Sequence, residues 1–141
     1  NTENAYHVMI TANLTVAAVI DGFTIKGGNA NGSESISYLL KGYLNNRGGG
    51  VYNSSSSPTI TNTTFLHNTA VSGGGMFTGS SSPIITNTTF SYNRADYGGG
   101  MVNGFSSSTT ITNTTLSNNN AFDNGGGGMD NGSTTPTITN T

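Results

Sequence analysis

Residues 73–93 read GGGMFTGSSSPIITNTTFSYN, and the rest of the chain repeats this stretch in register. Three glycines followed by an apolar residue also begin at Gly48, 25 residues before Gly73, at Gly98, 25 residues after it, and at Gly126, a further 28 along. An Ile-Thr-Asn-Thr segment follows each glycine run, at Ile60, Ile85, Ile111 and Ile138. A period of this length indicates a solenoid, in which copies too short to fold alone stack on one another.

The composition of each copy predicts strands and turns. Thr, Ile, Val and Phe favour strands, whereas Gly, Ser, Asn and Pro favour turns. Ile85 and Phe90 are five residues apart, so one straight strand would place them on opposite faces. Both point inward only if the chain bends, and Asn87 suits that bend because asparagine tolerates the left-handed conformation. We therefore expect an all-β parallel β-helix of about 25 residues per coil, with short strands at Met76, Ile85 and Phe90.

Stacked copies place equivalent residues above one another. We expect one core stack of Met76, Met101 and Met129, and another of Phe65, Phe90 and Leu116. We expect the bend asparagines to form an amide ladder between coils, and these are Asn62, Asn87, Asn113 and Asn140. In this prediction, Asn87→Leu removes hydrogen bonds between coils.

Two motifs carry a family resemblance that covers nearly the whole chain. The glycine runs and the Phe-x-x-Asn pattern at Phe65–Asn68 and Phe90–Asn93 resemble the GGA(I/L/V) and FxxN repeats of chlamydial polymorphic outer-membrane proteins. They are also similar to those of other bacterial right-handed parallel β-helix repeat proteins, whose fold is shared with pectate lyases. The resemblance implies a right-handed single-stranded helix in a secreted or cell-surface protein. It implies little about activity, because one fold carries many functions.

The repeats divide the chain into three parts of a single domain, residues 1–141. Residues 1–30 form a divergent first coil or coils, in which Ile20 aligns with Ile60 and Ile25 with Phe65, which brings Ala30 onto Ala70. Residues 31–47 are a loop insertion. It is either a flap that packs Leu39, Leu40 and Leu44 onto the coils or a binding loop. Residues 48–141 hold the regular repeats, and the unfinished last copy suggests truncation at the C-terminus.

The composition excludes several classes of function. The chain has 32% hydrophobic and 7% charged residues, a formal net charge of −2 and no cysteine. Disulfides and thiolate metal sites are therefore excluded, and the absence of a basic patch argues against nucleic acid as a partner. No apolar run is long enough to be a transmembrane segment. Low charge with abundant Asn, Thr and Gly fits an exported protein.

Candidate catalytic and metal-binding residues are few. Asp96 and Asp123 precede glycine runs in adjacent copies, with Arg94 nearby, so they are weak candidates for a Ca²⁺ site or for acid–base chemistry. No third carboxylate shares their strand, and we therefore expect no catalytic, cofactor-binding or metal-binding residues. A single histidine beside strand residues, His7, is expected to be structural.

Two further functional hypotheses remain open. Tyr52 and Phe77 beside the glycine runs could form an aromatic strip for sugar binding, although outward side chains on a half-exposed strand are the favoured interpretation. At the level of the whole chain, we expect a non-enzymatic scaffold, structural or adhesive, whose partners are further coils, copies stacked head-to-tail into fibres, or surface glycans. The alternative is a polysaccharide-active enzyme or a carbohydrate-binding β-helix.

Overall fold

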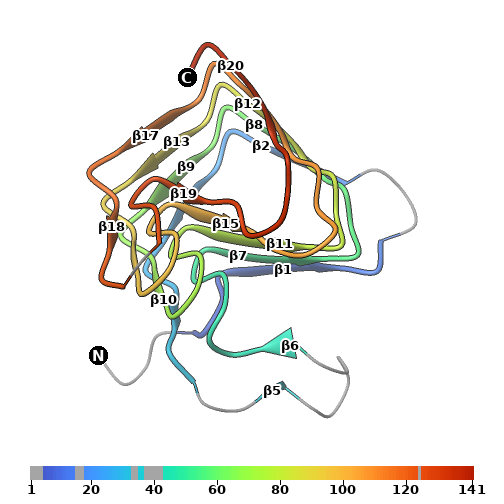
Figure 1. The fold of residues 1–141 in the computed structure, drawn as a ribbon. Helices are drawn as coiled ribbons and strands as arrows, with labels where there is room; N and C mark the ends of the chain where they lie inside the picture. The colour runs from blue at the N-terminus through green and yellow to red at the C-terminus, as the bar shows by residue number, and fades with distance from the viewer. Residues whose placement is uncertain (1–4, 15–17, 33–34, 37–42, 124) are drawn as a thin grey trace.

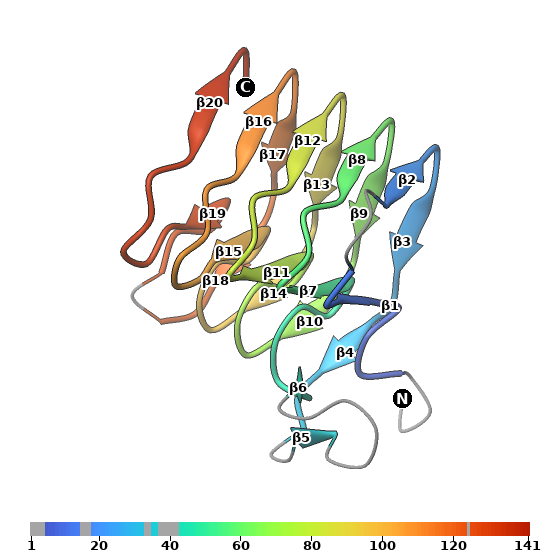
Figure 2. The same ribbon diagram turned by 90° about the vertical axis from the view of Figure 1, so that its right-hand side faces the viewer.

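The protein is a right-handed parallel β-helix, in which each coil of the chain lies on the one before it (Figure 1). A computed structural model describes residues 5–14, 18–32, 35–36, 43–123 and 125–141. All regular elements in this part of the chain are strands. Figure 2 shows the coils side by side, with the N-terminal coil at one end of the stack and the C-terminal coil at the other.

Each of the first four coils contributes one strand to each of four parallel sheets, and the last contributes to the first two; we number the sheets in the order in which a coil meets them. The first sheet holds β1 (Met9–Ala12), β7 (Val51–Ser54), β11 (Met76–Gly79), β15 (Met101–Asn103) and β19 (Met129–Asp130). The second holds β2 (Val19–Asp21), β8 (Thr59–Thr61), β12 (Ile84–Thr86), β16 (Thr110–Thr112) and β20 (Thr137–Thr139). The third holds β3 (Thr24–Lys26), β9 (Thr64–Leu66), β13 (Thr89–Ser91) and β17 (Thr115–Ser117). The fourth holds β4 (Asn29–Ala30), β10 (Thr69–Ala70), β14 (Arg94–Ala95) and β18 (Asn120–Ala121).

The strand register confirms the alignment of the first coil with the regular repeats. Ile20 pairs with Ile60, Ile25 with Phe65 and Ala30 with Ala70. The fourth sheet is an addition to the three strands expected per coil. Its strands are two residues long and turn only an alanine inward, so they carry no large apolar residue that a sequence pattern could reveal.

Large apolar residues fill the space between the sheets. Met76 and Met101 are fully buried and pair in register, and Met129 continues the stack half-buried. The rings of Phe65 and Phe90 stack with their centroids 4.4 Å apart and their planes 5° from parallel. The expected core stacks are therefore confirmed, and identical neighbours let each ring lie flat on the next.

The expected bend asparagines do adopt the left-handed conformation. Their φ angles are 50° at Asn62, 50° at Asn87, 48° at Asn113 and 51° at Asn140. These side chains point outward and are exposed. The Asn62 amide donates to Asp21 of the preceding coil (2.9 Å), whereas within the described residues Asn87 and Asn113 have no amide partner.

The amide ladder between coils lies at Asn68, Asn93 and Asn119, the asparagines of the Phe-x-x-Asn positions, and not at the bend between the second and third sheets. Asn68 Nδ2 donates to Asn93 Oδ1, and Asn93 Nδ2 to Asn119 Oδ1, each over 3.0 Å. Each amide also donates to a backbone carbonyl of the preceding coil, such as Phe65 O for Asn93. Asn68 and Asn93 are fully buried, so these bonds supply the partners that a buried amide requires.

The glycine runs allow close approach of the coils where the chain returns to the first sheet. Gly73 has φ +69°, which favours glycine, and a Cβ on Gly74 would collide with the carbonyl oxygens of Arg94 and Gly99. Because the obstacle is backbone, any larger residue at Gly74 would push neighbouring coils apart.

The insertion carries a short antiparallel pair, β5 (Ser35–Ile36) and β6 (Tyr43–Leu44). Figure 2 shows this pair outside the stack, beyond β4. Leu39 and Leu40 lie outside the described residues, as does the side chain of Leu44. The choice between a packed flap and a binding loop therefore stays a prediction.

Candidate functional site

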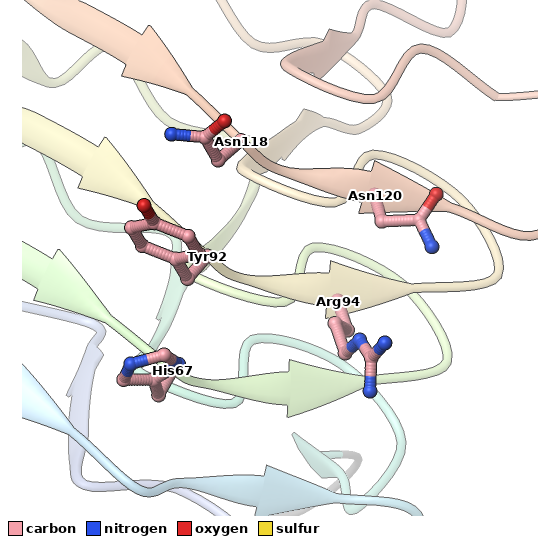
Figure 3. A pocket seen from close by; sticks show the side chains of 5 residues that line it. All are labelled: His67, Tyr92, Arg94, Asn118 and Asn120. Carbon is pink, nitrogen blue, oxygen red and sulfur yellow. The ribbon is translucent and has the colours of Figure 1, made fainter.

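A groove of about 340 Å³ crosses three coils where the third sheet turns into the fourth. His67, Tyr92 and Asn118 line one wall, and Arg94 and Asn120 line the other. Figure 3 shows the first three rising from coil to coil, with Arg94 and Asn120 beside them on the strands of the fourth sheet. The groove therefore runs along the stacking axis.

The first wall arises from a corner that every coil repeats. His67, Tyr92 and Asn118 follow β9, β13 and β17 directly and have φ angles of 52°, 52° and 53°. This left-handed corner turns their side chains outward. The His67 and Tyr92 rings lie 5.3 Å apart between centroids at 32°, and Tyr92 is 52% exposed. In the first coil this position is Gly27, where the space for a Cβ is open, so no side chain blocks that end of the groove.

The second wall provides polar groups. Arg94 on β14 and Asn120 on β18 are register partners in adjacent coils. The Arg94 guanidinium carbon lies 5.8 Å from the centre of the exposed Phe122 ring, a cation–π contact that orients the guanidinium group. Among the described residues that line the groove, Arg94 is the only Lys, Arg, Asp or Glu.

The structure brings Asp96 and Asp123 together, as their spacing predicted. The Asp123 N–H donates to the Asp96 carbonyl oxygen over 3.0 Å, so the two residues are neighbours in adjacent coils. Within the described residues, no group of three His, Cys, Asp or Glu side chains could hold a metal ion. Two carboxylates alone are fewer ligands than Ca²⁺ takes, which is six to eight oxygens.

Tyr52 and Phe77 do not form an open sugar-binding strip. Each is only 5% exposed, and their rings stack with centroids 5.6 Å apart at 14°. With Val102 they form a second apolar cluster on the outward face of the first sheet. The Arg47 guanidinium lies 4.8 Å above the Phe77 ring, and Gly104 packs against the edge of the same ring. The outward direction expected for these rings is correct, but the half-exposed surface is not.

His7 has the surroundings of a packing residue. Its Nδ1 donates to the Gly48 carbonyl oxygen over 3.0 Å, and its ring lies 5.5 Å from that of Tyr52. Burial lowers the pKa of His7 below its usual value, and hydrogen bonds to backbone carbonyls oppose this shift. The imidazole is therefore held neutral at neutral pH.

The sequence contains the groove residues but gives weak signals for them. His67 and Tyr92 occupy the position before the asparagine of Phe-x-x-Asn, which differs from copy to copy, so the repeat pattern does not single it out. The usable signal is two ring residues 25 apart at a site that the repeat turns outward. The neighbouring position of Arg94 appears only when the fourth sheet is known.

No protein-family model, curated protein or solved structure gives a significant match to this chain. Among the described residues there is also no helix of the length and apolar character needed to cross a membrane.

Proposed function

We propose that this chain is a non-enzymatic β-solenoid that serves as a structural or adhesive scaffold. The observation that carries the proposal is the use of its buried polar groups. In the repeats, these groups bond to other parts of the stack, either between coils, as in the ladder of Asn68, Asn93 and Asn119, or within one coil, as the Thr63 hydroxyl does with the Thr61 carbonyl. The buried side-chain atoms without a partner in the described residues lie in His7, Asn45 and Asn46, outside the regular repeats.

The surface supports a binding role better than a catalytic one. Hydrolysis or elimination on a polysaccharide needs an acid–base pair or a metal placed around the reacting bond. Asp96 and Asp123 are not among the described residues that line the groove, and those residues include no carboxylate. The rings and amides of the groove can instead bind a ligand without converting it.

We place this scaffold outside the cell or on the cell surface. The support is its composition, with 7% charged residues and abundant Asn, Thr and Gly, and the resemblance of its glycine runs and Phe-x-x-Asn motifs to chlamydial polymorphic outer-membrane proteins. The fold shared with pectate lyases supports the competing proposal of a polysaccharide-active enzyme. In that enzyme, Asp96 and Asp123 would be the acid–base or Ca²⁺-binding residues.

The test is a search for turnover. The protein is incubated with polygalacturonate and with neutral polysaccharides, with and without Ca²⁺, and the release of reducing ends and of unsaturated product is followed. We expect no release above the rate without protein. Turnover that disappears in Asp96→Asn would overturn the scaffold proposal, whereas turnover that persists in this variant would indicate a contaminating enzyme.

A further inference from the structure

We propose that the groove of His67, Tyr92, Arg94, Asn118 and Asn120 binds an extended, uncharged chain of pyranose sugars that lies along the stacking axis. This inference deepens the adhesive form of the proposed function, on which it rests. It assigns a ligand class to a surface built by three successive coils.

The direction of the groove selects a linear polymer. His67, Tyr92 and Asn118 stand at the same position of successive coils, and neighbouring strands lie about 4.8 Å apart. The wall therefore offers one side chain per coil over about 10 Å, a distance of two strand spacings. A chain with a short repeat can contact each of them in turn, whereas a compact ligand would contact only one or two.

The backbone around the groove disfavours an extended peptide. Such peptides commonly bind by adding a strand to an open sheet edge. The strands β13 and β14 at the centre of the groove are paired on both sides, with β9 and β17 and with β10 and β18. They have no free edge, so a ligand that crosses them must be held by side chains.

The two walls match the two kinds of surface on a pyranose. A sugar ring has an apolar face of C–H groups, which packs on exposed aromatic rings such as Tyr92 and His67. Its hydroxyl groups lie around the rim and can both donate and accept hydrogen bonds. The Arg94 guanidinium group supplies donors, and the amides of Asn118 and Asn120 supply donors and acceptors.

The charges favour a neutral sugar chain over an acidic one. Arg94 supplies the positive charge of the lining, and no Asp or Glu is among its described residues. Asp96 follows it by two residues, and Asp123 is the neighbour of Asp96 in the next coil. Two carboxylates next to one cation give no positive surplus for a polyanion.

The experiment is calorimetric titration with neutral hexasaccharides: β-1,4-linked glucose, mannose and N-acetylglucosamine, and β-1,3-linked glucose. The test variant is Tyr92→Asn, because Asn118 already occupies the equivalent left-handed position, so the ring is removed without backbone strain. The matched control is Tyr97→Asn, which changes a tyrosine of the same coil that is 43% exposed and does not line the groove. We expect at least one hexasaccharide to bind, with Tyr92→Asn weakening it about tenfold or more and Tyr97→Asn leaving it unchanged.

Three results would overturn the inference: no binding to any of the four sugars, equal affinity in Tyr92→Asn and the native protein, or tighter binding of hexagalacturonate than of the neutral chains. Monosaccharides should bind more weakly than hexasaccharides, and equal affinity would contradict a ligand that spans the coils. The two proposals fail separately. If no sugar binds, the groove inference fails and the proposal of a non-enzymatic scaffold still stands. If a bound sugar is cleaved, the proposal of a non-enzymatic scaffold fails and the groove inference still stands.

Discussion

Asn87 and Asn93 are six residues apart and occupy opposite environments. Asn93 is fully buried, and its amide links three coils through Asn68, Asn119 and the carbonyl of Phe65. Asn87 is exposed, and its contribution is a backbone conformation, with φ 50°. One residue type thus has two functions in the same repeat, hydrogen bonding inside and turn formation outside.

Substitution at the two positions should separate these functions. We expect Asn93→Leu to lower the free energy of unfolding by about 3 kcal/mol, because it leaves buried partners without hydrogen bonds. Asn87→Leu should cost about 1–2 kcal/mol from left-handed strain alone, and Asn87→Gly should restore most of that loss. Denaturant unfolding measures all three variants. Equal losses for Asn93→Leu and Asn87→Gly would contradict the assignment of the ladder.

The sequence could predict the bend but not the ladder. Asn87 lies between two apolar residues, Ile85 and Phe90, whose odd spacing in sequence requires a turn if both are to point inward. Its role therefore follows from local geometry. Asn93 recurs with the same period, and the sequence pattern does not show which asparagine points inward. That choice depends on the corner at Tyr92, which reverses the side-chain direction after β13.

At the scale of the elements, the strands of the last described coil leave apolar residues uncovered. Ile138 pairs in register with the fully buried Ile111 but is itself 46% exposed, and Leu116 and Met129 are half-buried. The first coil differs, because its inward residues Ile20 and Ile25 are only 4% and 2% exposed.

The elements themselves were predictable where an apolar residue marks them. Val51, Ile60 and Phe65 each identify a strand of their coil, and all three strands are present. The fourth sheet was missed because alanine is its only inward residue. The insertion was located from the length of the interruption, and the antiparallel pair within it has no counterpart in the repeats.

At the scale of the whole molecule, the ladder and the candidate groove are assembled from residues about 25 apart that become neighbours through stacking. The ladder, the core stacks and the groove all depend on this register. The period alone could predict that register, because stacking aligns equivalent positions whatever the side chains are. The groove could not be predicted, because its lining depends on which side chains point outward at two successive corners of the coil.

The most direct test of this central claim is a cross-linking measurement on pairs of introduced cysteines. The chain has no cysteine of its own, so Thr86→Cys with Thr112→Cys supplies the only two thiols, on register partners of adjacent coils. Thr61→Cys with Thr112→Cys is the control, on the same sheet but two coils apart, a separation of about 10 Å. A short bifunctional thiol reagent that fluoresces only when both ends react should bridge the first pair and not the second. Equal bridging of both pairs, or preferential bridging of the control, would contradict the stacked register and the groove that depends on it.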